Sequence, residues 1–265
     1  MAHDPIITFT TDFGVTDPYV GTMKGVILNI NPSARIVDIS NAVQSYDVLD
    51  GAITISQAYH YFPKNTLHLV IVDPGVGTAR RPIIVRAEHG VFIAPDNGVL
   101  SLIYEKEERV NVRHITAEHY FLQPVSQTFH GRDVFAAVAG YVSKGVDPAS
   151  LGEEIKDFVR FAAPRPKPID GLLKGSVIKV DKFGNLITNF TPKDVPQLFG
   201  ADPAAFKIKI GKAEVTNIRS AYAEGAPGEV FAIIDSMGFL EIAMNRGAAN
   251  RTIAAEKGTE VVISF

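Results

Sequence analysis

Residues Leu67–Gly77 read LHLVIVDPGVG, and this stretch sets the architecture of the N-terminal half. A short run rich in β-branched residues, Leu67–Val72, stops at a polar, glycine-containing turn that begins at Asp73. Such a run predicts a buried strand followed by a turn. The same pattern predicts further strands at Ile6–Thr11, Arg35–Ile39, Ile83–Ala87 and Val91–Ala94.

Helical segments are predicted between several of these strands. Apolar residues at helical spacing mark two of them: Val20, Met23, Ile27 and Ile30 on the first, and Val48, Ala52, Ile55 and Tyr59 on the second. A third helix is expected just after His130, with Asp133 as its N-cap. Strands that alternate with helices predict an α/β fold, a mostly parallel sheet sandwiched by helices.

The pattern changes at a proline-rich stretch, Ala162–Gly171, which reads AAPRPKPIDG. No helix interior or central strand accommodates three prolines in such close spacing. We therefore predict an N-terminal α/β domain over residues 1–163, a linker over 164–171 and a second domain over 172–265. The second domain consists of short predicted strands joined by glycine turns, which is typical of a small β-barrel.

Composition narrows the class of protein. Of the 265 residues 46% are hydrophobic, yet no apolar run approaches the roughly 18–20 residues that span a bilayer. The first residues lack the charged and apolar regions of a secretory signal, and the absence of cysteine fits the cytoplasm and excludes thiolate chemistry. A net charge of −3 without basic clusters argues against nucleic acid as a partner. We expect a soluble, cytoplasmic protein.

Polar clusters follow three predicted strands of the first half, at Thr10–Gly14, Asp73–Arg81 and Ala94–Gly98. In open parallel sheets, ligands bind beyond the carboxyl ends of the strands. Each aspartate there has an alternative role as a helix cap or turn residue. The glycines of Gly75–Gly77 let a backbone approach a ligand closely, but the segment matches neither the dinucleotide nor the phosphate-loop motif.

Three further places carry candidate residues, each with an ordinary structural alternative. His130 has the side chain best suited to general base catalysis near neutral pH, but its segment also starts a helix. Asp181–Asn185 is either a ligand-binding loop or a hairpin turn. Glu241 lies within an apolar strand, where the alternative is a charge that faces outward. The pattern alone names no substrate.

Six motifs occur in order along both halves: Thr11–Gly14, Val72–Gly77, Ala94–Gly98, Thr128–Asp133, Asp181–Asn185 and Ser236–Ala243. Together they resemble the S-adenosyl-L-methionine hydroxide adenosyltransferase family, the hydrolytic relatives of fluorinase and chlorinase enzymes. The resemblance covers nearly the whole chain. It implies an α/β sandwich with a C-terminal β-barrel, a homotrimer with sites at subunit interfaces, and attack of water on C5′ to give adenosine and L-methionine.

The resemblance also implies roles for single residues. The family's catalytic Asp-Arg-His set falls on Asp73, Arg80 and His130, and its ribose-binding aspartate falls on Asp12. Substrate contacts in the second domain fall on Asp181, Phe183, Asn185, Ser236 and Glu241, and the segment that closes over adenine falls on Asn245–Ala248. Arg81 is the alternative to Arg80, because a shift of one position also fits.

The chemistry of such a site is simple to state. A sulfonium leaves readily, so the barrier lies in activating water, whose pKa in bulk is about 15.7. A carboxylate and an imidazole can take up the proton, while Arg80 holds the carboxylate. The halogenating relatives lack the counterparts of Asp73 and His130, which favours hydrolysis over the halogenase alternative.

No metal and no cofactor is required, since S-adenosyl-L-methionine is itself the substrate. Two alternatives from other classes remain open at this point. One is a non-catalytic protein that binds adenosine, and the other is a metal-dependent hydrolase in which Asp73, Asp96 and His130 hold a hard cation.

Overall fold

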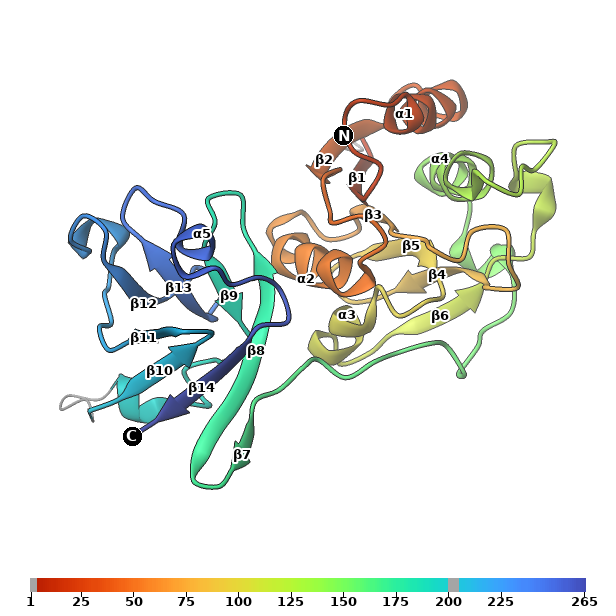
Figure 1. Ribbon diagram of the computed structural model, residues 1–265. Helices are drawn as coiled ribbons and strands as arrows, with labels where there is room; N and C mark the ends of the chain where they lie inside the picture. The colour runs from red at the N-terminus through yellow and green to blue at the C-terminus, as the bar shows by residue number, and fades with distance from the viewer. Residues whose placement is uncertain (1–3, 200–204) are drawn as a thin grey trace. The chain divides into compact units, whose positions relative to one another are not determined.

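The computed structural model describes residues 4–199 and 205–265. The chain forms two compact units, Met1–Ala163 and Pro164–Phe265 (Figure 1). Within the described ranges, no helix is both long enough and apolar enough to cross a membrane.

The first unit contains one six-stranded sheet. Its strands are β1 (Ile6–Thr11), β2 (Arg35–Ser40), β3 (Leu67–Ile71), β4 (Pro82–Arg86), β5 (Val91–Pro95) and β6 (Asn111–His114). They lie in the order β2-β1-β3-β5-β4-β6. The pairs β1–β2, β1–β3 and β3–β5 are parallel, whereas β4 pairs antiparallel with both β5 and β6. The predicted α/β class is confirmed, and the sequence analysis missed β6.

Helices cover both faces of this sheet (Figure 1). The helices are α1 (Tyr19–Ile30), α2 (Val48–Ala58), α3 (Ser101–Lys106) and α4 (Ala137–Ser143). Helices α1 and α4 contact each other on one face, and α2 contacts α3 on the other. Helix α3 was not predicted, and its six residues make fewer than two turns.

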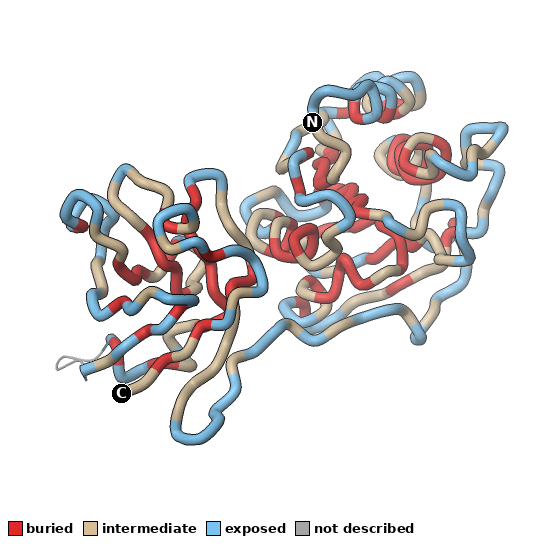
Figure 2. The backbone as a smooth tube through the Cα atoms, viewed as in Figure 1, coloured by how far each residue is buried: buried red, intermediate tan, exposed pale blue. Residues whose placement is uncertain are grey.

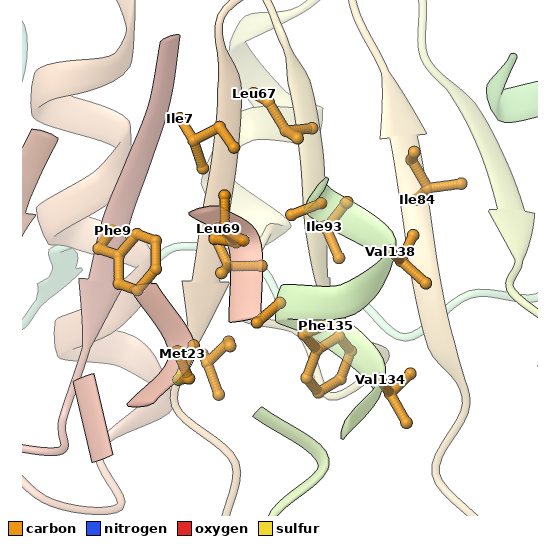
Figure 3. Close-up of a cluster of buried hydrophobic side chains, with 14 of the residues drawn as sticks. Ile7, Phe9, Met23, Leu67, Leu69, Ile84, Ile93, Val134, Phe135 and Val138 are labelled. Atoms are coloured by element: carbon orange, nitrogen blue, oxygen red, sulfur yellow. The ribbon is translucent and has the colours of Figure 1, made fainter. Parts of the chain in front are cut away.

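The sheet of the first unit has a hydrophobic cluster on each face, and the side chains of β3 alternate between these two clusters. Leu67, Leu69 and Ile71 belong to the cluster under α1 and α4, while Val70 and the following Val72 belong to the cluster under α2. Successive residues of a strand point to opposite faces, so a strand buried on both faces is mostly apolar. The polar exception in β3 is His68, which is fully buried and shares a hydrogen bond of 2.7 Å with the Thr8 hydroxyl. Figure 3 shows Leu67 and Leu69 beside Ile7 and Ile93 of the neighbouring strands.

The helix after His130 begins differently from the prediction. Residues Gly131–Ala136 form a π-helical turn that continues into α4. Asp133 lies inside this turn and is fully buried. Its carboxylate accepts hydrogen bonds from the Ser126 amide (2.8 Å) and from Arg132 Nε (2.6 Å). The predicted N-cap role of Asp133 is therefore wrong, because the residue anchors the loop that precedes the helix.

The second unit is an antiparallel sheet that curls into a barrel. Its strands are β7 (Lys167–Ile169), β8 (Leu172–Val180), β9 (Leu186–Thr188), β10 (Lys207–Ile210), β11 (Ala213–Val215), β12 (Val230–Ile234), β13 (Leu240–Met244) and β14 (Glu260–Ser264). The main order is β11-β10-β14-β8-β9-β13-β12. Ile218, three residues after the end of β11, makes an isolated β-bridge with Ala232 of β12. This bridge joins the two ends of the strand order. The predicted β-barrel is confirmed in this nearly closed form.

Short helical segments complete the chain. One α-helix, α5 (Ala249–Ile253), follows β13, and 3₁₀ turns lie at Tyr59–Tyr61, Glu118–Tyr120, Pro148–Leu151, Pro196–Leu198 and Tyr222–Glu224. Figure 2 shows buried residues concentrated on the strands inside each unit, with exposed residues in the connections.

The proline-rich stretch is not irregular throughout. Its residues Lys167–Ile169 form β7, which pairs with β8 at the edge of the barrel sheet. Pro168 lies in this strand, and an edge strand tolerates proline because one side of its backbone makes no ladder bonds. The predicted linker 164–171 thus contains an edge strand that the sequence analysis did not foresee.

Gly77 allows a close approach between the loop after β3 and the loop before His130. Its φ is +76°, and a Cβ at this position would lie 2.2 Å from the carbonyl oxygen of Gln127. We expect Gly77→Ala to lower the free energy of unfolding by about 1–3 kcal/mol through overpacking. Gly145 is the control, since its φ is also positive but no atom lies within 4 Å of its Cβ position. Urea denaturation showing equal losses in both variants would contradict this expectation.

Candidate active site

Two aspartates follow adjacent parallel strands of the first unit. Strands β1 and β3 pair in register so that Thr11 faces Ile71, and Asp12 and Asp73 come shortly after these residues. The carboxyl ends of the two strands therefore bring both aspartates to one edge of the sheet, as the sequence predicted for a ligand site.

Asp12 is held by the backbone of a neighbouring loop. Its Oδ2 accepts a hydrogen bond of 2.8 Å from the amide of Tyr46. Burial raises the pKa of Asp12, and the charge of Asp73 adds to this, although hydrogen bonds from backbone amides oppose it. Tyr46 has a positive φ of 64° and its ring is 76% exposed. Tyr46 was not predicted as a site residue. The structure identifies it, because its amide donates to Asp12 and its side chain is exposed.

Arg80 joins Asp73 to His130. Its Nε lies 3.1 Å and 2.9 Å from the two Asp73 carboxylate oxygens, and its Nη2 lies 2.6 Å from Oδ2. The same Nη2 is 2.8 Å from His130 Nδ1. The side chains of Arg80 and Asp73 are 8% and 5% exposed. The three residues assigned to catalysis by resemblance thus form one buried cluster, which we call the triad.

The triad determines which nitrogen of His130 carries the proton. A guanidinium has no lone pair to offer, so Arg80 Nη2 must donate and His130 Nδ1 must accept. Neutral His130 therefore carries its proton on Nε2. Burial and the charge of Arg80 lower the pKa of His130, against weaker contributions from Asp73 and Asp133. A proton acceptor was predicted at His130, but the contact with Arg80 leaves the imidazole as a hydrogen-bond donor through Nε2.

Arg81 makes a separate set of contacts. Its Nε and Nη2 donate to Asp96 Oδ2 at 2.9 Å and 2.7 Å, and its Nη1 donates to Asp157. Consecutive residues point in different directions, so the structure places Arg80 and not Arg81 on Asp73.

The metal alternative finds no support in the geometry. Within residues 4–199 and 205–265, no group of three or more histidine, aspartate or glutamate side chains is placed to hold a metal ion. Asp96, which that alternative required, is instead neutralised by Arg81.

In the second unit, the turn between β8 and β9 is organised by Asp181. Its Oδ1 accepts from the amides of Phe183 (2.9 Å) and Asn185 (2.8 Å), and its Oδ2 accepts from Asn185 Nδ2 (3.0 Å). The fixed turn leaves the ring of Phe183 74% exposed. The segment is thus a tight turn, and it also presents an aromatic face.

A pocket of about 590 Å³ opens beside this turn. It is lined by Asp181, Phe183, Asn185, Tyr222, Met244, Arg246, Gly247 and Ala248. Three residues predicted from the sequence and most of the predicted closing segment therefore share one pocket, while Tyr222 and Met244 were missed. Ser236 lies outside this lining and is exposed.

Glu241 faces inward. It is 2% exposed on β13, and its Oε1 accepts a hydrogen bond of 2.9 Å from the hydroxyl of Tyr222. Burial raises the pKa of Glu241 to about 7, with further contributions from the charges of Asp181 and Asp235 and an opposing one from Tyr222. The alternative of an outward-facing charge is excluded. Asp235, which is buried and absent from the sequence prediction, adds a third carboxylate to this region.

Family models match both units of the chain. Residues 7–152 match the model of the SAM hydroxide adenosyltransferase N-terminal domain, and residues 175–262 match that of the C-terminal domain. The chain belongs to the SAM hydroxide adenosyltransferase family. All nine site residues predicted for this adenosyltransferase-family chain lie inside the matched ranges.

Individual relatives cover most or all of the chain. A protein of Methanocaldococcus jannaschii named (R)-S-adenosyl-L-methionine hydrolase is 34% identical, over 98% of this chain and 96% of its own. A protein of the same name from Salinispora tropica is 32% identical, over 100% and 99%. A fluorinase of Actinoplanes is 26% identical over 91% of each chain. A crystal structure of a Thermotoga maritima protein matches with a TM-score of 0.89 at 34% identity, over 98% and 100%.

Replacing Glu241 with glutamine tests the burial of this carboxyl group. The folded protein holds a proton on Glu241 up to about pH 7, whereas the ordinary pKa is 4.5, so the stability associated with that proton is lost as the pH rises through 7. Glutamine is neutral throughout, and Glu241→Gln should raise the melting temperature more at about pH 8 than at about pH 5.

Calorimetry at the two pH values measures this difference. The control is Glu214→Gln, which neutralises a carboxylate of the same unit whose side chain is 41% exposed. A shift for Glu241→Gln that is the same at both pH values would show that its carboxyl group titrates normally.

Proposed function

We propose that this protein hydrolyses S-adenosyl-L-methionine to adenosine and L-methionine. The observation that carries the proposal is the buried triad, in which Arg80 contacts both Asp73 and His130. The full-length relatives named (R)-S-adenosyl-L-methionine hydrolase support the substrate and the reaction.

In the proposed reaction, a water oxygen forms a bond to C5′ and the C5′–S bond breaks. Its electron pair goes to sulfur, which becomes the neutral thioether of methionine. Asp73 is the acceptor for the water proton, because Oδ1 accepts only one hydrogen bond from Arg80 and keeps lone-pair capacity. His130 donates from Nε2 and orients the water, and the positive charge of Arg80 stabilises the developing hydroxide.

We propose that the substrate is bound by groups of both units. Asp12 suits the ribose, because one carboxylate accepts hydrogen bonds from two neighbouring hydroxyls. Phe183 and Tyr222, which line the pocket of the second unit, suit stacking against adenine. Asp181 and Glu241 suit the amino-acid end of the substrate, since carboxylates attract its ammonium group. Ser236 suits the same end because its hydroxyl can donate a hydrogen bond to the substrate carboxylate.

We also propose a cytoplasmic homotrimer that works without metal or cofactor and whose sites form at subunit interfaces. Each unit presents exposed aromatic rings beside its own candidate residues, Tyr46 in the first and Phe183 in the second. Each ring offers an aromatic face against which a substrate or a neighbouring subunit can pack. Light scattering on the active protein tests the trimer, and full activity in a particle of one chain mass would contradict it.

Chromatography of S-adenosyl-L-methionine incubated with the purified protein tests the reaction. We expect adenosine and L-methionine in equal amounts, above a control without protein. Tight binding of adenosine with no turnover would instead favour a binding protein and would overturn the proposal.

Asp73→Asn is expected to lower turnover by roughly 10²–10⁴-fold, the range for a positioned acid–base group. Asparagine keeps the shape of the side chain but cannot take up the proton. Asp38→Asn is the matched control, because Asp38 pairs with Lys24 at the surface of the same unit. Initial rates at saturating substrate measure the effect, and an Asp73→Asn protein of normal turnover would remove this carboxylate from the mechanism.

The site is expected to use water even in concentrated chloride. Two like charges about 4 Å apart at an effective dielectric near 20 repel by roughly 4 kcal/mol, so the Asp73 carboxylate disfavours an anionic nucleophile. Arg80 offsets part of this repulsion. Mass spectrometry should detect adenosine as the product in molar chloride, and a dominant 5′-chloro-5′-deoxyadenosine would contradict an ionised Asp73 beside the nucleophile.

A further inference from the structure

A second cavity of the first unit reaches the triad. It has a volume of about 540 Å³, and its lining includes Arg80 and His130 but neither Asp12 nor Asp73. Gln127 and Glu118 also line it, and both are exposed. We call this space the flanking cavity. It connects the triad with the surface along residues that the proposed function does not use for substrate binding.

Two buried donors of the triad belong to residues that line the flanking cavity. Arg80 Nη1 and His130 Nε2 are buried, and neither has a hydrogen-bond partner within the part of the chain that the structure describes. Both carry hydrogen, because Arg80 is a guanidinium and the tautomer of His130 places its proton on Nε2. A buried donor without a partner destabilises the folded protein, and an acceptor oxygen that pairs with it removes this cost. An acceptor oxygen that reaches these two nitrogens from the cavity would give both donors a partner.

The flanking cavity is larger than a single water requires. One water occupies about 30 Å³ in the liquid, far less than the cavity volume of about 540 Å³. Its charges are also balanced, since Arg80 pairs with Asp73, and the remaining carboxylate, Glu118, lies exposed. A neutral molecule that carries a hydroxyl group fits these conditions better than an anion does.

We propose that the flanking cavity delivers the nucleophile to the triad and admits small neutral alcohols as well as water. The protein then has a second activity, transfer of the adenosyl group from S-adenosyl-L-methionine to methanol. This inference rests on the proposed function. The methanol oxygen bonds to C5′, the C5′–S bond breaks with its electron pair going to sulfur, and the hydroxyl proton passes to Asp73. The products are 5′-O-methyladenosine and L-methionine.

The test is the ratio of the two nucleoside products over a series of methanol concentrations. The wild-type protein should form both adenosine and 5′-O-methyladenosine, with a ratio of ether to adenosine that rises in proportion to methanol. Mass spectrometry separates the products, and a control without protein corrects for spontaneous methanolysis.

Variants that narrow the flanking cavity test whether methanol reaches the triad through it. Gln127→Trp places a large ring on an exposed lining residue, and Thr116→Trp does so from another segment of the lining. Both should lower the ratio of ether to adenosine several-fold, because methanol is larger than water. Leu122→Trp is the matched control, since Leu122 is 42% exposed in the same loop as Gln127 and is not part of the lining.

The outcomes separate the two proposals. Adenosine without ether at every methanol concentration would overturn the second activity and leave hydrolysis intact. Ether formed in the same ratio by wild-type and both lining variants would overturn the flanking cavity as the route. A protein that forms neither nucleoside, even without methanol, would overturn the proposed function and this inference together.

Discussion

The guanidinium of Arg80 is the group on which the polar site of the first unit depends. Removing an ion from water costs several kcal/mol unless good geometry and further hydrogen bonds offset it. Asp73 provides both, through short contacts from Nε and Nη2 to its carboxylate. Because Nη2 also donates to His130, one buried cation fixes the orientation of a carboxylate and the tautomer of an imidazole. The properties of each triad member therefore cannot be separated from the other two.

Residues outside the triad hold its parts in place. His130 arrives on a loop whose backbone passes close to Gly77, where no side chain fits. The buried carboxylate of Asp133 ties the same loop to the π-helical turn through the Ser126 amide. A π-turn is rare and inserts an extra residue into a helix, which here comes directly after His130. The position of His130 thus depends on backbone packing at Gly77 and on the hydrogen bonds of the buried Asp133 carboxylate three residues further along the chain.

The sequence predicted those parts of the fold that have a local signal. Strands β1, β3 and β5 are short apolar runs that end in turns, and they were found within one or two residues. Strand β6 (Asn111–His114) was not predicted because it contains only one apolar residue. It forms a strand by pairing with β4. The role of Asp133 was predicted wrongly because an aspartate beside a helix start can cap the helix or be buried with backbone partners. Only the surrounding structure distinguishes the two roles.

The same limit applies to the site. Resemblance gave the identity of the candidate residues, but adjacent arginines are equivalent in sequence, and only the direction of each side chain separates Arg80 from Arg81. The partner of the buried Glu241 carboxylate is Tyr222, whose hydroxyl donates to it from a 3₁₀ turn 19 residues away. The tautomer of His130 follows from one contact with Arg80. Each of these features is a relation between segments far apart in the chain, which no local pattern records.

The carboxylates of the second unit set a balance between binding and rate. On the proposed function, the substrate carries a positive sulfur that becomes neutral as the C5′–S bond breaks. Negative charge near the amino-acid end favours the charged substrate over the transition state, and an interaction that is stronger in the ground state slows the reaction. The raised pKa of Glu241, about 7, keeps part of this charge neutral at physiological pH. On the proposed function, the buried position of Glu241 therefore weakens the attraction for the sulfonium, while the remaining carboxylates attract the ammonium group.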